Sequence, residues 1–188
     1  GGFGGIGLAV AERLARETRA PLALLSRNPL PPRAEWDRAL RQEGGPMASR
    51  IRAVRRLEAL GVPVVALAAD VANLEEMRDA VAEAEAALGP LSGVVHAAGV
   101  IDDAPILGKD PAAVEDVLAP KVLGTQVLHE VFPDGRLDWL VLFSSSSTAT
   151  APGGQVDYVA ANAFLGAYAR HRSRGRTRVL ALDWGVWH

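Results

Sequence analysis

Short apolar runs alternate along the chain with longer segments in which apolar positions recur every three or four residues. The runs are too short for stable helices and suit strands buried in a sheet. The longer segments have the spacing of helices with one apolar face. This alternation predicts an α/β fold with a Rossmann-like, doubly wound parallel sheet. The expected strands are 21–25, 64–69, 93–98, 138–143 and 178–182, and the expected helices are 6–17, 74–88, 111–131 and 156–173.

Local signals mark the ends of the expected elements unevenly. Asn73 is a typical N-terminal cap for the helix at 74–88, and Gly89-Pro90 is a typical stop. Residues 28–50 are too long for a simple connection, with proline and glycine clusters around an expected helix at 33–43 and a further helix expected at 50–60. We interpret 28–50 as a surface insertion, with a substrate or partner loop as the alternative.

Composition narrows the class of function. The 188 residues contain 49% apolar residues, which suffices for one domain with its own core, and we assign a single domain to 1–188. The net charge of −2 does not favour nucleic acid or an anionic membrane as a partner. The absence of cysteine excludes disulfides, zinc–thiolate sites and thiol catalysis, and the histidines are scattered, so no metal site is expected. No apolar stretch approaches the roughly 18 residues of a membrane span, so a cytoplasmic protein is expected.

The chain begins with a glycine-rich loop, GGFGGIG, followed directly by a helical pattern. Gly2, Gly4 and Gly7 fit the G-x-G-x-x-G fingerprint, in which small residues let the backbone approach a pyrophosphate at the start of a helix. Gly5 and Ile6 complete this candidate cofactor-binding loop. A tight turn without a ligand is the alternative interpretation. Such a loop follows a strand, which is expected upstream of Gly1, so we expect the chain to be a segment of a larger polypeptide.

The end of the next expected strand indicates which dinucleotide would bind. An NAD site usually presents an acidic residue there, whereas this chain has Ser26 and Arg27. A guanidinium suits the 2′-phosphate of NADP, so NADPH is the expected cofactor. Asp70 and Val71 follow the strand after that and are candidates for the adenine contact, although Asp70 could instead cap the next helix.

The strand expected at 93–98 leads into small residues that would let a cofactor lie across the sheet edge. These are Ala97, Ala98 and Gly99. His96 lies within the apolar strand, and we interpret it as a structural residue.

Four residues form the candidate catalytic set. Tyr158 and Asn162 lie one helical turn apart, Lys121 lies on an earlier helix, and Ser145 follows an apolar strand in FSSSST. A free tyrosine titrates near pH ~10, and a nearby ammonium is the usual way to stabilise a phenolate. The set therefore offers an acid, a cation that tunes it, and a hydroxyl that can hold a carbonyl oxygen. Each residue alone has an ordinary structural interpretation, but their joint occurrence with a glycine loop favours a catalytic site.

These motifs resemble one family over the whole chain. GGFGGIG, LLSR, HAAGVIDD, APKVLGT, LFSSSS and YVAANAFLGAYA are similar to the ketoreductase domains of modular polyketide synthases, a branch of the short-chain dehydrogenase/reductase superfamily. In most of that superfamily the lysine follows the tyrosine by four residues. Here Asn162 holds that position and the lysine is Lys121, an exchange that resembles the polyketide and fatty acid synthase ketoreductases.

The resemblance implies a reaction and its partners. It implies NADPH-dependent reduction of a β-ketoacyl thioester, carried on the phosphopantetheine of an acyl carrier protein, beside other synthase domains in the same chain. Tyr158 would donate the proton, Ser145 would bind the ketone oxygen, Lys121 would tune the tyrosine, and Asn162 would position Lys121 or a water. The alternatives are a non-catalytic structural domain of a synthase and a free-standing reductase of a small ketone.

Departures and markers within the family bear on the product. Phe3 replaces the threonine often found in the glycine loop. Ile101-Asp102-Asp103 resembles the Leu-Asp-Asp marker of the B-type, with Asp103 as the stereocontrol residue. Thr150 replaces the tryptophan of the A-type, and Ala160 replaces the proline of the epimerising subclass. The resemblance therefore implies a B-type (3R) product.

Overall fold

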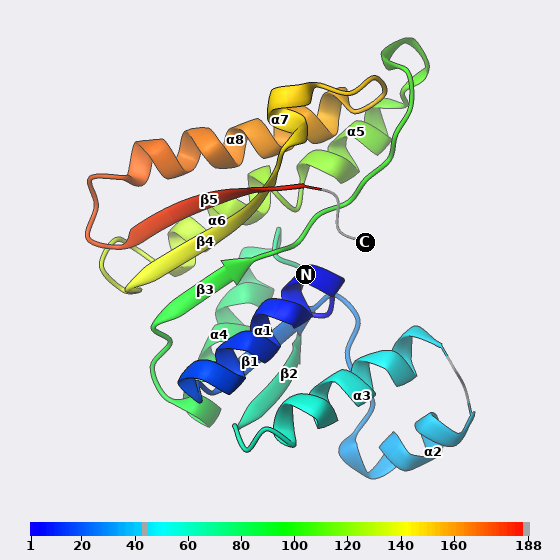
Figure 1. The fold of residues 1–188 in the computed structure, drawn as a ribbon, viewed down its shortest axis with the longest axis vertical. Helices are drawn as coiled ribbons and strands as arrows, with labels where there is room; N and C mark the ends of the chain where they lie inside the picture. The colour runs from blue at the N-terminus through cyan, green and yellow to red at the C-terminus, as the bar shows by residue number, and fades with distance from the viewer. Residues whose placement is uncertain (43–44, 186–188) are drawn as a thin grey trace. The chain divides into compact units, whose positions relative to one another are not determined.

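The computed structural model describes residues 1–42 and 45–185, and these form two compact units. The first unit consists of Gly1–Asp70 and Arg78–Pro90, and the second consists of Val71–Met77 and Leu91–His188. Figure 1 labels their helices and strands. In the described part of the chain no helix combines the length and the apolar character needed to cross a bilayer.

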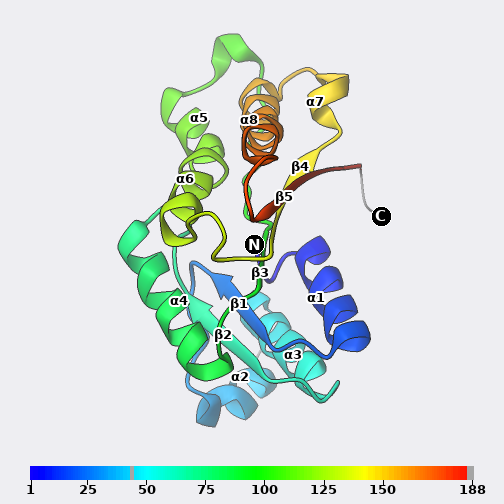
Figure 2. The ribbon, with the colours of Figure 1, turned by 90° about the vertical axis from the view of Figure 1, so that its left-hand side faces the viewer.

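The first unit is built on a pair of parallel strands. β1 (Leu22–Ser26) pairs in parallel with β2 (Val64–Ala68), with Leu22 opposite Val64. Figure 2 shows α1 (Gly5–Thr18) and α3 (Pro46–Glu58) on one side of these strands and α4 (Leu74–Leu88) on the other. The helices α1 and α3 turn alanine, isoleucine, valine and leucine side chains toward β1, and these make up the core of the unit.

The second unit is built on three parallel strands. β3 (Gly93–His96), β4 (Trp139–Ser145) and β5 (Arg178–Trp184) pair in that order. The helices of this unit are α5 (Pro111–Leu118), α6 (Val122–Val131), the short α7 (Ser147–Thr150) and α8 (Val156–Arg172). Figure 2 shows α5, α6 and α8 on one side of β4 and β5.

The predicted α/β class and the parallel pairing are confirmed, although the strands form two sheets where we expected one. Each predicted strand is present within a few residues of its expected ends. The prediction for α4 is confirmed at both ends. The Asn73 side chain accepts hydrogen bonds from the N–H groups of Glu75 (3.1 Å) and Glu76 (3.3 Å), and Gly89 ends the helix with a φ of +85°.

The expected single helix over 111–131 is wrong. The structure has α5 and α6 with a break at 119–121, because Pro120 has no N–H group to donate to the preceding turn. The N–H of Gly124 reaches back to the Ala119 carbonyl at 3.0 Å and closes the gap. Lys121 lies at the break and becomes the residue before α6.

The segment 28–50, interpreted as a surface insertion, is anchored to the first unit by one large side chain. It contains a short 3-10 turn (Arg33–Glu35), α2 (Trp36–Gln42) and the start of α3. Trp36 is only 4% exposed and belongs to the core cluster with Ile51 and Val54 of α3. The helix expected at 50–60 begins earlier, at Pro46, and the last residue of the helix expected at 33–43 lies outside the described residues.

Candidate active site

Ser145, the candidate catalytic serine, lies at the last position of β4. Its hydroxyl oxygen accepts a hydrogen bond from the Ser147 N–H at 3.2 Å and lies 2.8 Å from the Ser147 hydroxyl. The turn into α7 therefore supplies donors to Ser145 Oγ. Because a serine hydroxyl has one proton of its own, Ser145 can still donate that proton to an oxygen in front of it. No motif in the sequence predicted this supporting role of Ser147.

Tyr158 and Asn162 lie in the first turns of α8, and Asn162 is fully buried. The Asn162 amide Nδ2 donates to the Tyr158 carbonyl at 2.7 Å, which leaves its Oδ1 buried without a hydrogen-bond partner. The Ser144 hydroxyl donates to the Asn162 carbonyl at 3.3 Å and ties α8 to β4. A buried acceptor without a donor is rare in folded proteins, and it marks a place where an ammonium or a water would be stabilised.

Lys121 is a buried cation of the second unit. It is 4% exposed, and its Nζ donates to the Phe143 carbonyl of β4 at 2.7 Å. Burial lowers the pKa of this lysine to about 8, because the low dielectric disfavours the charged form. An ammonium has three protons to donate, so the bond to Phe143 leaves donors for a further group.

The residues after β3 lie beside this lysine. Ala97 and Ala98 are partly buried and Gly99 is exposed. A methyl group added to Gly99 would lie 3.1 Å from Lys121 Cε, so the lysine side chain would have to shift to make room for it. At the end of β3, burial and the charge of Lys121 lower the pKa of His96 to about 3, which keeps this histidine neutral. A neutral buried side chain agrees with the structural interpretation of His96.

The glycine loop lies at the start of α1 in the first unit. The Gly2 N–H donates to the Leu25 carbonyl of β1 at 3.2 Å, and a methyl group on Gly2 would meet the same backbone at 3.1 Å. A methyl group on Gly5 would meet nothing within 4 Å. The loop is thus packed on one side and open on the other.

The N-terminus of α1 has the features of an anion-binding site. Its cap residue, Gly4, provides no side-chain hydrogen bond, and the first turn contains no acidic residue. The N–H groups of Gly5, Ile6 and Gly7 precede the first bond within the helix, from Leu8 N–H to the Gly4 carbonyl at 2.8 Å. These free donors and the helix dipole favour a phosphate.

The strand ends of the first unit carry the other candidate cofactor residues. The Ser26 hydroxyl donates to the Asn28 carbonyl at 2.9 Å, and Arg27 is exposed just after β1. Asp70 lies two residues after β2, and the cap of α4 is Asn73 rather than Asp70.

Val71, the second candidate for the adenine contact, belongs to the second unit. A methyl group on Gly124 would lie 2.9 Å from its Cγ1, so the Val71 side chain packs against the start of α6.

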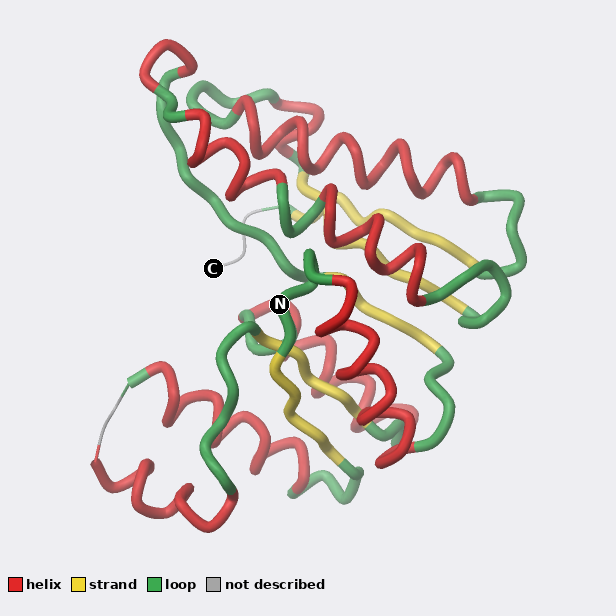
Figure 3. The backbone as a smooth tube through the Cα atoms, turned by 180° about the vertical axis from the view of Figure 1, so that it is seen from behind, coloured by secondary structure: helices red, strands yellow, loops and turns green. Residues whose placement is uncertain are grey.

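The segment that carries Asp103 is held against the start of α8. Figure 3 shows it as part of the long loop that follows β3. Asp103 Oδ2 accepts a hydrogen bond from Gln155 Nε2 at 2.8 Å, and the Ala104 N–H donates to the Gly154 carbonyl at 3.0 Å. Gly154 has a φ of +86°, a conformation that favours glycine.

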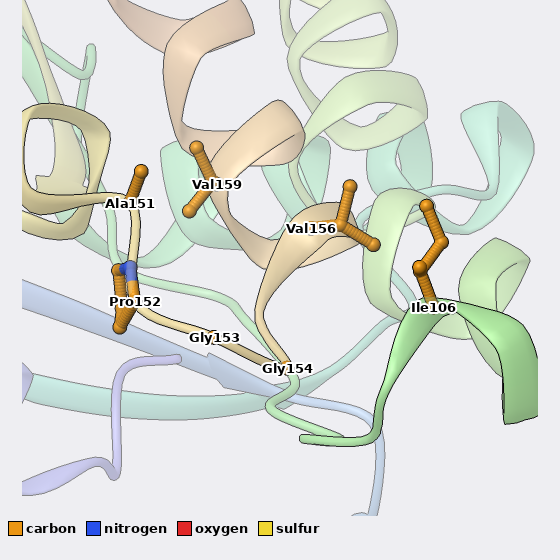
Figure 4. A pocket seen from close by; sticks show the side chains of 7 residues that line it. All are labelled: Ile106, Ala151, Pro152, Gly153, Gly154, Val156 and Val159. Atoms are coloured by element: carbon orange, nitrogen blue, oxygen red, sulfur yellow. The ribbon is translucent and has the colours of Figure 1, made fainter.

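A pocket of about 340 Å³ lies between these two segments, and its side chains are apolar (Figure 4). An apolar pocket of this size can hold part of a small acyl chain. Its lining residues are Ile106, Ala151, Pro152, Gly153, Gly154, Val156 and Val159. These residues come from the 3-10 turn at Ile106–Gly108, from the loop before α8 and from the first turns of α8, so no single sequence motif marks the pocket. Among the described residues, no group of three histidine, aspartate or glutamate side chains is arranged to hold a metal ion.

Comparison with known proteins decides the family. The family model described as "KR domain" matches residues 1–188. The chain belongs to the KR domain family. It is 40% identical over its whole length to 6-methylsalicylic acid synthase of Aspergillus terreus, and 38% identical to a phenolphthiocerol/phthiocerol polyketide synthase of Mycobacterium tuberculosis. The chain spans 10% of the length of each of these relatives.

Solved ketoreductases share the fold of this KR domain. An N-terminal ketoreductase from the macrolactin assembly line matches 99% of the chain with a TM-score of 0.86 at 30% identity, and the match covers 36% of that structure. A structure titled as A-type ketoreductases from a modular polyketide synthase matches all of the chain with a TM-score of 0.80 at 39% identity, covering 37% of that structure. The predicted family and the predicted short-chain dehydrogenase/reductase fold are confirmed. A ketoreductase domain of this fold implies an oxidoreductase with a nicotinamide cofactor.

The contact between Gly99 and Lys121 leads to a prediction. Gly99→Ala should lower the rate of ketone reduction about tenfold while the fold is retained, because the added methyl group displaces the lysine side chain. The measurement is the steady-state rate with NADPH and a model β-ketoacyl thioester. Gly108→Ala is the matched control, since a methyl group there meets nothing within 4 Å. Wild-type turnover in Gly99→Ala would contradict the prediction.

Proposed function

We propose that this KR domain reduces a β-ketoacyl thioester, carried on an acyl carrier protein, to the β-hydroxyacyl thioester with NADPH during polyketide or fatty acid synthesis. The observation that carries the proposal is the buried ammonium of Lys121, which is bonded to the Phe143 carbonyl and lies just before α6. The relatives are large synthases, and this supports the proposal that other synthase domains are partners of this domain.

The residues of the second unit would divide the chemistry among them. A bound nicotinamide supplies the hydride for the keto carbon. Tyr158 donates a proton to the forming alkoxide, and Ser145 donates its hydroxyl proton as a hydrogen bond to the same oxygen. One such donor, placed in advance, can lower the barrier by about 3 kcal/mol. Because Ser147 donates to Ser145 Oγ, the proton of the Ser145 hydroxyl stays available for the substrate oxygen.

Lys121 and Asn162 would support the tyrosine. The positive charge of Lys121 stabilises a phenolate on Tyr158, and a remaining donor of its ammonium can hold the nicotinamide ribose. The buried Oδ1 of Asn162 has no hydrogen-bond partner in the structure, and it would accept from that ammonium or from a relay water. A purely structural domain would not need a buried lysine and a buried unpaired amide oxygen, each of which destabilises the fold. A free-standing reductase of a small ketone has no comparable support in the relatives.

The first unit offers residues that fit NADPH. We assign the pyrophosphate to the free N–H groups of Gly5, Ile6 and Gly7, with Gly2 and Gly4 allowing its approach. Ser26 and Arg27 are assigned to the 2′-phosphate and Asp70 to the adenine. In the second unit, Val71 is also assigned to the adenine, and Ala97, Ala98 and Gly99 are assigned to the ribose and nicotinamide.

Removal of the tyrosine hydroxyl tests the proposed acid. Tyr158→Phe should lower kcat by more than about a hundredfold and leave NADPH binding nearly unchanged, because only the reacting centre loses a group. Tyr168→Phe is the matched control on the same helix, where the hydroxyl bonds to His129 at 3.1 Å. If Tyr158→Phe keeps more than about a tenth of the wild-type turnover, Tyr158 is not the acid.

Cofactor choice tests Arg27. Arg27→Ala should weaken NADPH binding roughly tenfold to a hundredfold and change NADH binding little, because the paired, charge-assisted bonds to a 2′-phosphate contribute about 1.5–3 kcal/mol. Titration of both cofactors measures the ratio. Arg13→Ala, which removes a cation from the exposed face of α1, serves as the control. Equal weakening of both cofactors would exclude the proposed contact.

The hydroxyl product should have the 3R configuration of the B-type, without inversion of an α-substituent. The support is Ile101-Asp102-Asp103, Thr150 and Ala160, together with the bond from Gln155 to Asp103, which fixes the loop after β3 against the loop before Tyr158. An A-type structure shares 39% of its residues with the chain, so overall identity does not decide the type. Chiral chromatography of the product measures the ratio, and mainly 3S alcohol would refute the assignment.

A further inference from the structure

A buried ion pair joins the loop after β3 to the start of α8, outside the residues that the reaction itself requires. Lys109 Nζ lies 2.6 Å from Asp157 Oδ2, and the two side chains are only 3% and 1% exposed. By comparison, the side chains of the pair Arg16–Glu12 on α1 are 58% and 40% exposed. The charged groups of the Lys109–Asp157 pair are therefore shielded from solvent, unlike those of the pair on α1.

Each member of the pair also binds a residue that the proposed function uses. Lys109 Nζ donates a second hydrogen bond to the Asp102 carbonyl, in the Ile101-Asp102-Asp103 segment. Asp157 Oδ1 accepts from the Tyr158 N–H at 2.9 Å. A continuous chain of bonds thus runs from the stereocontrol segment, through the two charges, to the backbone of the proposed acid.

The energetics do not favour this pair as a stabilising device. Two charges lose their hydration when they are buried, and an apolar pair of similar volume often gives equal or greater stability. Removing one charge alone is costly, because the other then stays buried without a partner. A buried pair of this kind restricts the two segments to the arrangement in which the charges meet, so it contributes to geometry more than to stability.

The carboxylate is ionised in this setting. Burial opposes ionisation of Asp157, but the hydrogen bond from Lys109 and the one from the Tyr158 N–H outweigh it and lower the pKa of Asp157 below its ordinary value. Asp157 therefore carries its negative charge near neutral pH.

We propose that Lys109 and Asp157 are positioning residues, which lock the 101–109 loop to the first turn of α8 and thereby fix both the Tyr158 hydroxyl and the side of substrate approach. The inference rests on the proposed ketone reduction for its kinetic consequences. Neither residue touches the reacting atoms in this assignment, so both act through Tyr158 and Asp103.

The test uses the protein with Lys109→Met, with Asp157→Asn, and with both changes in a double variant. The double variant is decisive because it removes both charges, keeps similar volumes and leaves no unpaired charge. We expect it to keep a thermal midpoint close to that of the wild type. We also expect kcat to fall about tenfold and the share of the minor enantiomer to rise. Amide hydrogen exchange in 101–109 should become faster. Glu12→Gln, which breaks the exposed pair on α1, should change none of these.

Two results would overturn the proposal. One is a double variant with wild-type kcat, enantiomer ratio and amide exchange. The other is a loss of activity that follows the fall in thermal midpoint while the enantiomer ratio and the exchange in 101–109 stay unchanged, which would show a purely structural role. If the wild type reduces no β-ketoacyl thioester, the proposed function fails, and the exchange measurement still decides whether the pair holds the two segments together.

Discussion

The second unit depends on one constraint, which is that a buried ammonium must keep its hydrogen-bond partners. Lys121 meets it with the Phe143 carbonyl, in a strand that also uses its backbone for pairing with β5. Pro120 interrupts the helix, and Lys121 lies in the resulting turn, directly before α6. The small residues around it follow from the same requirement, since Gly99 leaves room for the side chain and Gly124 lets α6 approach Val71 and His96.

Other polar groups of the proposed site are also held by hydrogen bonds within the protein. Ser147 donates to the Ser145 hydroxyl oxygen, and Ser144 ties the backbone of Asn162 to β4. These bonds are made by the protein alone, before any substrate is present. Preorganised donors of this kind are what stabilise a developing charge, because they need no rearrangement when the reaction occurs.

The sequence predicted the elements whose signals are local. Periodicity located the strands and α8, and Asn73 with Gly89 located α4 to the residue, because caps and turns depend on neighbouring positions. Apolar residues recur with helical spacing throughout 111–131, because α5 and α6 each bury apolar residues. This spacing predicted one helix where the structure has a break at Pro120. The motif residues Tyr158, Asn162, Lys121 and Ser145 could be selected from spacing and resemblance. Their partners could not, because Lys109 and Asp157 are 48 positions apart and neither belongs to a motif.

The same separation has a consequence for how such domains change and how they are recombined. A substitution at Lys109 or Asp157 alone leaves the other charge buried without its partner. The two positions are therefore expected to vary together rather than one at a time. The hydrogen bonds from Gln155 to Asp103 and from Ala104 to Gly154 couple the same two stretches. A graft that transplants the 101–109 loop from another ketoreductase would separate partners that match only within their own chain. The exchangeable unit is therefore discontinuous, consisting of 101–109 together with 154–158, and these two stretches have to move as one.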